Sequence, residues 1–566
     1  MPLSGGEQVA PVYRDAYESM NVTYPMSPLI ARRAVRLVTR LYHASCALAA
    51  SPRKAVIAVG IASAAMAMVG QLTRAARQPG VTDELSYLLA ADTFAAGRLT
   101  NPAHPMWKHF EAEQVLVRPT YQSRYPPGQG LLLAAGKYFG GSPAAGVWLS
   151  FGALGAALCW MLQPWVGRRT AFFGTLAYMP WIATSYWSFT YWGGTLAALG
   201  GALVYGVLRR LDRASGAVHG VLLGSGVVLL ASTRMYEGFL TTVPAAAYFL
   251  YWLAKPDPNR RWTRRAAVTV PLVAVLAGGA ALTLRYNRAV TGDAWTLPYL
   301  LYARQYDRSP VFFWMETRDS LLLREVGPDK TEGIGQYQSG RTVSGLIRTF
   351  ARRLGDFSLF FVPVPLALAL VLRGRLALRD RWTAAAVGVV AVVWVGMWAS
   401  LAFAPHYAAP LTGLVLAVLL MSLRWLHRVP VRHRWLRRLA SPTTLLWVCV
   451  ALGVAKGFTY LIVRYETDRT NWTAVRARFA KQLREAGGQH LVVVRYGPHH
   501  ESSYEWVYNE ADIDRAAVVW AHELGPQETE RLLEYFRGRR VWRVEMTNDR
   551  GPFVLLPLNA RGQPQG

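Results

Sequence analysis

The chain has 566 residues, of which 52% are hydrophobic, and it contains 21 Trp and 27 Tyr. Its mean hydropathy of +0.16 is too high for an ordinary soluble protein and is typical of a polytopic membrane protein with sizeable loops. The formal net charge is +28, but residues 462–566 carry 15 basic and 14 acidic residues. The excess therefore lies in short clusters between apolar runs, as the positive-inside rule predicts, and this argues against a nucleic-acid-binding protein.

A polar and then basic stretch over residues 1–54 opens the chain, and we predict that it is a cytoplasmic segment. A helix needs about 20 apolar residues to cross ~30 Å of hydrocarbon. About eleven runs approach that length, and they predict an α-helical transmembrane domain over residues 55–461. The predicted spans are, in chain order, 55–72, 144–163, 170–186, 190–208, 218–233, 236–253, 266–284, 356–372, 382–400, 408–425 and 442–461.

Clusters of Lys and Arg follow alternate predicted spans, so they all fall on one side of the membrane if the N-terminus is cytoplasmic. Most acidic residues between the first and last spans then fall on the other side. This topology predicts a multi-pass protein of the inner (plasma) membrane. It directs three parts to the periplasmic or extracellular face: the outer loops 73–143 and 285–355, and the C-terminal part 462–566.

Two adjacent acids, Asp83 and Glu84, stand near the start of the first outer loop. Leu85, Leu88 and Leu89 follow at helical spacing, which predicts a helix lying on the membrane surface. Acids in the first turn of a helix are favoured by its dipole. The pair is therefore either an N-terminal capping feature or a catalytic pair at the membrane surface.

The sequence Tyr125-Pro126-Pro127-Gly128 closes the same loop. The two prolines stiffen the chain and the Pro-Gly step turns it. An apolar run follows, so the motif is also the expected start of a helix. The tight turn would place Arg124 at the level of the lipid headgroups.

An outer loop that follows the first span, opens with Asp-Glu and a nearby Tyr, and closes with Tyr-Pro-Pro-Gly resembles that of the GT-C membrane glycosyltransferases. The chain looks most like the bacterial relatives of the dolichyl-phosphate-mannose protein mannosyltransferases, over roughly residues 50–460. The resemblance implies the GT-C fold, a sugar donor on a polyprenyl phosphate, an acceptor on the outer face and an acidic general base in this loop. Asp83 matches the position of that base, and Glu84 is its neighbour.

Glycosyl transfer with inversion needs a carboxylate that takes the proton of the acceptor hydroxyl group, and cations or backbone donors that stabilise the leaving phosphate. A charged pair between two spans is either an interface pair or a functional one. A His in a short outer turn between two prolines is either an interface residue or a ligand contact. We predict that the donor phosphate or sugar contacts Arg234, His406, Arg124, Glu237 and Tyr125.

Two aromatic segments are candidates for a groove that holds the acceptor or the lipid. Tyr191 and Trp192 join two predicted spans on the outer side, where an aromatic belt is the alternative interpretation. Asn287 and Tyr306 lie in the second outer loop, in a stretch dense in aromatic residues and Arg. An amphipathic segment lying on the membrane surface would explain that stretch equally well.

The C-terminal part, residues 462–566, is predicted to form a soluble α/β domain. Its apolar patterning changes from membrane-length runs to short alternating segments and one amphipathic helix. The predicted strands are 490–496, 516–522, 541–547 and 552–558, and the predicted helix is 526–539.

The sequence contains no glycine-rich nucleotide-binding loop and no metal-ligand constellation. The sequence therefore shows no requirement for a cofactor, and a divalent metal is possible. The expected partners are a polyprenyl-phosphate-linked sugar donor, a glycan, lipid or protein acceptor, and membrane lipids. A transporter or flippase of lipid-linked saccharides is an alternative that fits the spans but not the large outward domain. A non-catalytic scaffold with the same fold is another.

Overall fold

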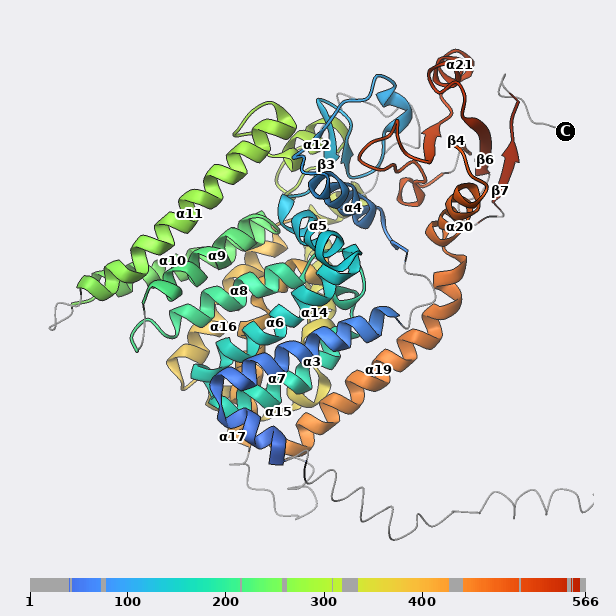
Figure 1. Cartoon of the computed structure of the whole chain (residues 1–566). Helices are drawn as coiled ribbons and strands as arrows, with labels where there is room; N and C mark the ends of the chain where they lie inside the picture. Colours follow the sequence, from blue (N-terminus) through green and yellow to red (C-terminus); the bar gives the residue numbers. More distant parts are fainter. Residues whose placement is uncertain are drawn as a thin grey trace, which may run out of the picture.

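The chain folds into a bundle of long apolar helices with a sheet-containing domain at one end (Figure 1). The computed structural model describes residues 40, 43–72, 78–213, 216–256, 262–307, 309–317, 334–426, 441–497, 500–546, 551 and 553–559. Most of the predicted N-terminal segment, 1–54, lies outside these residues. The bundle consists of α3 (Pro52–Leu72), α6 (Pro143–Val166), α7 (Arg168–Ala183), α8 (Thr195–Leu208), α9 (Ala217–Ala231), α10 (Met235–Ala254), α11 (Trp262–Thr291), α14 (Val343–Phe361), α15 (Val364–Ala377), α16 (Arg381–Trp398), α17 (Thr412–Trp425) and α19 (Pro442–Thr470).

This bundle confirms the predicted polytopic α-helical membrane fold. Among the described residues, six helices are long and apolar enough to cross a membrane, and a bent pair of helices is a seventh candidate. Two of the predicted spans, α8 and α9, are shorter apolar helices. Each predicted span coincides with a helix of the bundle or with the bent pair.

The predicted span 356–372 is divided between two helices and is not one continuous helix, because the chain bends there by 110°. Helix α14 ends at Phe361 and α15 begins at Val364, within a Val-Pro-Val-Pro sequence. Proline has no backbone N–H group, and it disfavours the helical conformation of the residue before it. Pro363 and Pro365 therefore divide an apolar run whose hydropathy alone predicts one helix.

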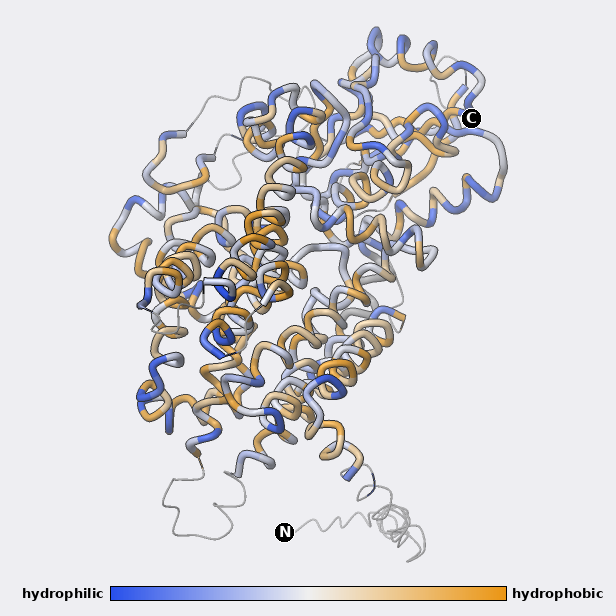
Figure 2. Tube along the Cα trace, turned by 60° about the vertical axis from the view of Figure 1, so that its left-hand side comes forward, coloured by the Kyte–Doolittle hydropathy of each residue, from blue (hydrophilic) through white to orange (hydrophobic). Residues whose placement is uncertain are grey.

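Helix α6 and the segment Pro405–Trp425 form the centre of the bundle. In the most apolar stretch of each helix, 72% of the residues are buried in α6 and 94% in Pro405–Trp425, compared with 11% in α11. The peripheral helices therefore present apolar side chains outward, as helices in contact with lipid must. Figure 2 shows apolar residues along the bundle and polar residues toward its ends.

Two segments, which we call the outer segments after the predicted outer loops, lie at one end of the bundle (Figure 1). The first connects α3 to α6, and it contains α4 (Thr82–Ala95), β1 (Asn101–Pro102), η2 (Trp107–Phe110), β2 (Val115–Leu116), β3 (Thr120–Ser123) and α5 (Pro127–Gly140). In it, β3 pairs antiparallel with β1 and with β2. The second follows α11, and it contains α12 (Pro298–Tyr306) and α13 (Ile334–Gly340).

The C-terminal domain is a four-stranded sheet with helices, as predicted. The strand order is β5-β4-β6-β7, in which β4 pairs parallel with β5 and β6, and β7 pairs antiparallel with β6. Its elements are α20 (Trp472–Glu485), β4 (His490–Tyr496), η6 (Ser502–Tyr504), β5 (Val518–His522), α21 (Pro526–Tyr535), β6 (Arg540–Met546) and β7 (Val554–Pro557). All four strands and α21 lie within, or within one residue of, the predicted ranges.

The C-terminal domain and the first outer segment share one hydrophobic core. Phe110 and Val115 of the outer segment pack in the same buried cluster as Trp520 and Leu532 of the domain. The long helix α19 leads from the bundle to α20 beside this shared core (Figure 1). The domain is therefore packed against the outer segments, and it is not an independent appendage.

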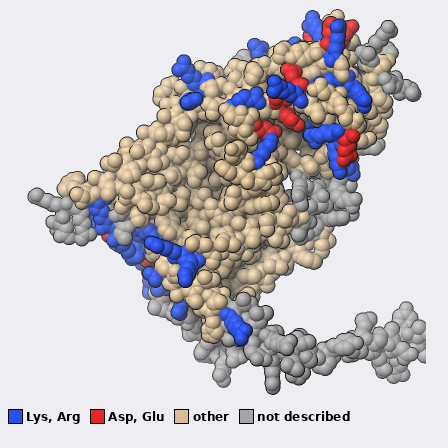
Figure 3. Space-filling model, viewed as in Figure 1, with Lys and Arg blue, Asp and Glu red and all other residues tan. Residues whose placement is uncertain are grey.

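Charged side chains are distributed unevenly along the molecule. In the view of Figure 3, acidic residues gather over the outer segments and the C-terminal domain, and basic residues also cluster at the opposite end. Between the two ends lies a broad surface with few charges. This pattern matches a membrane-embedded belt, because charged side chains are costly in hydrocarbon.

Candidate functional site

Asp83 and Tyr125 bring the two sequence motifs of the first outer segment into contact. The Tyr125 hydroxyl group donates a hydrogen bond to Oδ1 of Asp83. Burial, and then the Asp83 carboxylate, raise the pKa of the Tyr125 phenol well above its ordinary value. The phenol therefore stays protonated as a donor. Among the described residues, Oδ2 of Asp83 accepts no hydrogen bond, so one carboxylate oxygen is available to a substrate.

Glu84 has a different environment from its neighbour. It is 2% exposed, and its two carboxylate oxygens accept hydrogen bonds from the backbone N–H groups of Gly80 and Tyr191. The N-cap residue of α4, Val81, makes no side-chain cap. Glu84 thus satisfies a backbone donor just before α4 and ties the helix to the segment between α7 and α8. Asp83 makes no such bond, which removes the capping interpretation for that residue.

Tyr87 extends the Asp83–Tyr125 pair toward the bundle. It lies one helical turn after Asp83, and its ring stacks on that of Tyr125 with centroids 4.6 Å apart. Burial raises the pKa of the Tyr87 phenol above its ordinary value, and its electrostatic neighbours are Arg234, Asp83, Tyr407 and Arg124. The stacked phenols therefore connect the acidic residue of α4 with residues from distant helices.

Arg234 enters this cluster from the short connection between α9 and α10. Its guanidinium group lies over the Tyr407 ring, 4.5 Å from the centroid. Glu237, in the first turn of α10, is 7% exposed and interacts electrostatically with Arg234. Arg234 therefore has Glu237 and three tyrosines, Tyr87, Tyr125 and Tyr407, as electrostatic neighbours. Asp83 acts on the same three tyrosines.

The position of Arg234 depends on the glycine of the Tyr-Pro-Pro-Gly motif. Gly128 lies in the first turn of α5, where backbone N–H groups have no partner within the helix. Its N–H group donates to the Ser232 carbonyl oxygen at 2.8 Å. A Cβ atom on Gly128 would lie 2.7 Å from that oxygen and 2.9 Å from Cγ2 of Thr233. The motif therefore lets α5 pack directly on the backbone that leads into Arg234.

We expect Gly128→Ala to displace the segment of Ser232 and Thr233, and with it Arg234. Overpacking of this kind costs about 1–3 kcal/mol of stability. The matched control is Gly278→Ala in α11, where an added Cβ meets no atom within 4 Å. Thermal unfolding of the two variants and of the wild type measures the loss of stability. Equal behaviour of the two variants would contradict the packing role.

His406 lies beside the cluster, in the 3-10 helix η4 (Pro405–Leu411). It is fully buried; its Nδ1 lies 2.7 Å from the Tyr186 hydroxyl oxygen, and its ring centroid lies 4.5 Å from that of Trp192. Its Nε2 is buried and has no hydrogen-bond partner among the described residues. Since buried polar atoms are nearly always paired, Nε2 is a candidate contact for a ligand. Arg234 is its electrostatic neighbour.

Arg124 joins the two outer segments. Its Nη1 lies 3.1 Å from Oδ2 of Asp307, and its guanidinium group lies 4.6 Å from the ring centroids of both Tyr299 and Tyr302. The side chain is nearly buried, at 9% exposure. Arg124 therefore contributes positive charge at the edge of the cluster while it holds the second outer segment in place.

Tyr191 and Trp192 border the same cluster. The backbone N–H group of Tyr191 donates a hydrogen bond to Oε1 of Glu84. The Tyr191 carbonyl oxygen accepts a hydrogen bond from the Gln129 side chain at 2.9 Å. Trp192 lies against Tyr186 and His406. These two aromatic residues thus lie next to the cluster, and their part in a groove for acceptor or lipid stays a prediction.

Asn287 and Tyr306 lie elsewhere. Asn287 is buried near the end of α11, where its side chain donates to the Ala294 carbonyl oxygen at 3.1 Å. The Tyr306 hydroxyl group donates to Oε1 of Glu111 at 3.1 Å, which joins α12 to the first outer segment. Both contacts are internal, and a groove formed by these residues stays a prediction.

Sequence reasoning missed Tyr407 and Tyr299 as members of the site. Tyr407 follows His406 in a turn bounded by two prolines, and Tyr299 stands three residues before Tyr302 in an aromatic-rich stretch. The turn and the aromatic stretch are visible in the sequence, but nothing in the sequence indicates that Tyr407 contacts Arg234 or that Tyr299 contacts Arg124. Within the described residues, no group of three or more His, Cys, Asp or Glu side chains is arranged to hold a metal ion.

Comparison with known proteins gives the fold a name. No protein-family model and no curated protein sequence matches the chain. The crystal structure of ArnT from Cupriavidus metallidurans in the apo state aligns with a TM-score of 0.52 and 15% identity, over 88% of this chain and 93% of that chain. The structure of the same protein bound to undecaprenyl phosphate aligns with a TM-score of 0.50 and 14% identity, over 86% of this chain and 92% of that chain.

The crystal structure of the Archaeoglobus fulgidus oligosaccharyltransferase in the apo form aligns more weakly. Its TM-score is 0.42 and its identity 9%, over 77% of this chain and 62% of that chain. The similarity to ArnT spans most of both chains. The chain therefore has the GT-C fold, as its resemblance to that superfamily implied.

Proposed function

We propose that this GT-C-fold chain is an integral membrane glycosyltransferase that moves a sugar from a polyprenyl-phosphate-linked donor to an acceptor at the outer face of the inner membrane. The observation that carries the proposal is that Asp83 and Arg234 act on the same three tyrosines, Tyr87, Tyr125 and Tyr407. The two residues come from separate parts of the chain and are joined through the stacked phenols of Tyr125 and Tyr87. An acid and a partly buried cation at one cluster of tyrosines suit a reaction that removes a proton and expels a phosphate.

In the proposed reaction, an acceptor hydroxyl oxygen attacks the anomeric carbon of the donor sugar. Oδ2 of Asp83 takes the hydroxyl proton while the new C–O bond forms. The bond between the anomeric carbon and the phosphate oxygen breaks, and its electron pair leaves with the polyprenyl phosphate. Tyr125 holds Oδ1 of Asp83 and fixes the direction of the second oxygen. We assign the base to Asp83, because both oxygens of Glu84 accept from backbone donors.

The leaving phosphate gains negative charge as the sugar departs, and Arg234 would stabilise it. The Tyr407 ring beneath the guanidinium group fixes its orientation. The imidazole Nε2 of His406 would contact the phosphate or the sugar, and Glu237 would orient Arg234. The ArnT structure that contains undecaprenyl phosphate supports a lipid phosphate as the donor's leaving group.

On this proposal the site faces the periplasm or the extracellular space, and the N-terminus is cytoplasmic. Tyr191 and Trp192 would form an aromatic wall beside the sugar, since aromatic faces pack well on sugar rings. The acceptor is a glycan, a lipid or a protein. The C-terminal domain, which shares its core with the first outer segment, would lie on the acceptor side.

The test is an assay of purified protein in proteoliposomes with polyprenyl-phosphate sugars labelled in the sugar. Free polyprenyl phosphate and labelled acceptor are both measured by mass spectrometry. We expect the two products to appear together and in equal amounts when a suitable acceptor pool is present. Movement of labelled lipid across the bilayer without release of polyprenyl phosphate would instead support a flippase, and would overturn the proposal.

A further inference from the structure

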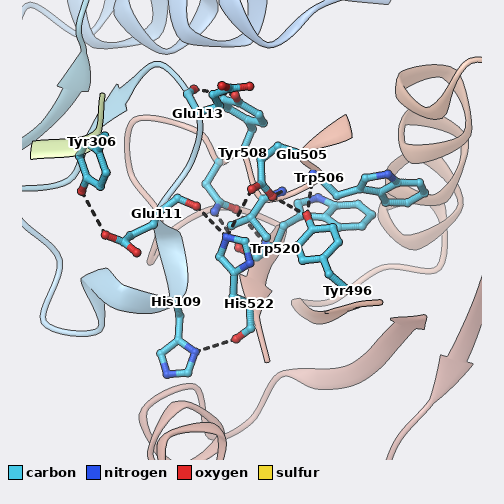
Figure 4. Close-up of polar contacts among 12 residues, drawn as sticks. His109, Glu111, Glu113, Tyr306, Tyr496, Glu505, Trp506, Tyr508, Trp520 and His522 are labelled. Carbon is cyan, nitrogen blue, oxygen red and sulfur yellow. Dashed lines mark hydrogen bonds and ion pairs between the residues drawn. The ribbon is translucent and has the colours of Figure 1, made fainter. Parts of the chain in front are cut away.

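Residues 109–114, which we call the hub segment, lie where the C-terminal domain meets the membrane domain (Figure 4). The His522 ring nitrogen Nε2 lies 2.7 Å from the Glu111 carbonyl oxygen. In return, the His109 ring nitrogen Nδ1 lies 2.7 Å from the His522 carbonyl oxygen. These reciprocal contacts fasten the hub segment to the end of one strand.

That strand is β5, and the contact occurs at its carboxyl end. In open parallel α/β sheets, ligands bind outside the carboxyl ends of the strands. Here His522 is the last residue of β5, and the hub segment fills the space beyond it. The C-terminal domain therefore uses the ligand-binding edge of its sheet to hold a part of the same chain.

A second contact from the domain reaches the far end of the hub segment. The Tyr508 hydroxyl group donates to the Glu113 carbonyl oxygen at 2.6 Å (Figure 4). Tyr508 is 6% exposed and Glu113 is 4% exposed. Water does not compete with such a buried bond, so it restrains the backbone of the hub segment more than a surface contact would.

The opposite side of the hub segment bonds the helix that carries Asp83. Thr82 Oγ1 lies 3.4 Å from Oε2 of Glu113, and the Ser86 hydroxyl group donates to the Gln114 carbonyl oxygen at 2.7 Å. Thr82 and Ser86 lie on either side of Asp83 in the first turns of α4. A shift of the hub segment would therefore move the Asp83 backbone.

The hub segment itself is held in an uncommon conformation. Gln114 has a φ of 65°, the only positive φ of a non-glycine residue among those described. Its N–H group donates to the Tyr302 hydroxyl oxygen at 3.0 Å, and its carbonyl oxygen accepts from Ser86 and from the Arg124 backbone. Such a conformation persists only where surrounding contacts determine it, and it often occurs at functional sites.

We propose that the C-terminal domain positions the catalytic helix α4 through the connected contacts Tyr508–Glu113–Thr82, and that Tyr508 is a positioning residue for Asp83. This inference rests on the proposed role of Asp83 as the base. Removal of the Tyr508 hydroxyl group removes one hydrogen bond to the Glu113 carbonyl oxygen, and so loosens the residue whose side chain contacts Thr82. A displacement of about 1 Å at a reacting group can lower a rate by as much as 10²-fold.

The central experiment compares Tyr508→Phe with Tyr121→Phe in the full-length protein. The Tyr121 hydroxyl group donates to the Asn509 carbonyl oxygen at 3.1 Å, so it is a buried Tyr–carbonyl bond across the same interface. We expect Tyr508→Phe to lower kcat by about tenfold with little change in the KM for the donor, because positioning affects the chemical step. The Tyr121→Phe control should keep kcat within about twofold of the wild type. Equal losses in both variants would mean a general loosening of the interface, and would overturn the proposal.

Thr82 tests the same connection from its other end. Thr82→Val removes the hydroxyl group and should lower kcat as Tyr508→Phe does, whereas Thr82→Ser keeps the hydroxyl group and should restore it. If both residues act through Glu113, the double variant Thr82→Val/Tyr508→Phe should lose no more than the stronger single variant. Multiplicative losses would show independent effects and would overturn the connection.

A readout without catalysis separates this proposal from the proposed function. Hydrogen exchange of the α4 amides at residues 82–86 should be faster in Tyr508→Phe than in the wild type, and unchanged in Tyr121→Phe. Unchanged exchange in Tyr508→Phe would overturn the positioning role even if kcat fell. Absence of sugar transfer by the wild-type protein would refute the proposed function, and the exchange comparison would still decide whether the domain restrains α4.

Discussion

Asp83→Asn is expected to abolish measurable sugar transfer while the protein still folds. The substitution keeps the size of the side chain and a carbonyl oxygen that can accept from Tyr125, but it removes the group that takes the acceptor proton. A positioned general base contributes about 10²–10⁴-fold to a rate, which is about 3–5 kcal/mol of transition-state stabilisation. Because binding contacts are kept, the loss should appear in kcat and not in the KM for the donor.

The matched control is Asp92→Asn on the same helix. Oδ1 of Asp92 lies 2.7 Å from Nζ of Lys137 on a partly exposed surface. The pair lies outside the cluster of Tyr87, Tyr125 and Tyr407, which we call the phenol cluster. A partly exposed pair of this kind contributes about 0–1 kcal/mol to stability, so this variant should fold and transfer sugar normally. Initial rates of polyprenyl phosphate release, measured for both variants at saturating donor, make the comparison. Undiminished transfer by Asp83→Asn would show that another group is the base.

The sequence predicted the architecture because its signals are local. Apolar runs of membrane length, basic clusters between them and short strands after residue 462 all depend on neighbouring residues, and the structure contains the corresponding helices and sheet. The exception at 356–372 also has a local cause. Two prolines stand inside an apolar run, and hydropathy gives no weight to a missing backbone donor.

The candidate site was only partly predictable, because its contacts join residues far apart in the chain. Asp83 and Tyr125 could be chosen from motifs, but the bond between them and the stack of Tyr87 on Tyr125 need the fold. Arg234 was identified as a charged residue at the end of a span. The reason for its position, the close approach of Gly128 to Ser232, depends on a backbone contact across about a hundred residues that no local pattern encodes.

The two acids of the first outer segment show what side-chain environment adds to sequence. Asp83 and Glu84 are adjacent, and a motif cannot separate their roles. The structure directs them to opposite partners: Glu84 accepts from two backbone N–H groups, whereas Asp83 accepts from one phenol. Since consecutive residues of a helix point in different directions, only one of the pair can face the site.

Arg234→Gln is expected to lower transfer by about 10²–10³-fold, the loss typical of removing one donor to a developing negative charge. The planar guanidinium group over Tyr407 combines positive charge with several N–H donors, and glutamine keeps a donor without the charge. Arg234→Lys keeps the charge but not the planar stack, so its activity should lie between those of Arg234→Gln and the wild type. Both variants should also bind the donor more weakly, because its phosphate is charged before the reaction.

The control for this pair is Arg118→Gln, since Arg118 also lies over an aromatic ring of the first outer segment, 5.0 Å from the Trp107 centroid, but outside the phenol cluster. Its transfer rate should remain close to that of the wild type. Donors with leaving groups of different acidity sharpen the test: a better leaving group needs less stabilisation, so it should rescue Arg234→Gln and leave Asp83→Asn inactive. If the two variants responded alike to the leaving group, Arg234 would not stabilise the departing phosphate, and its place among the tyrosines would have to serve substrate binding alone.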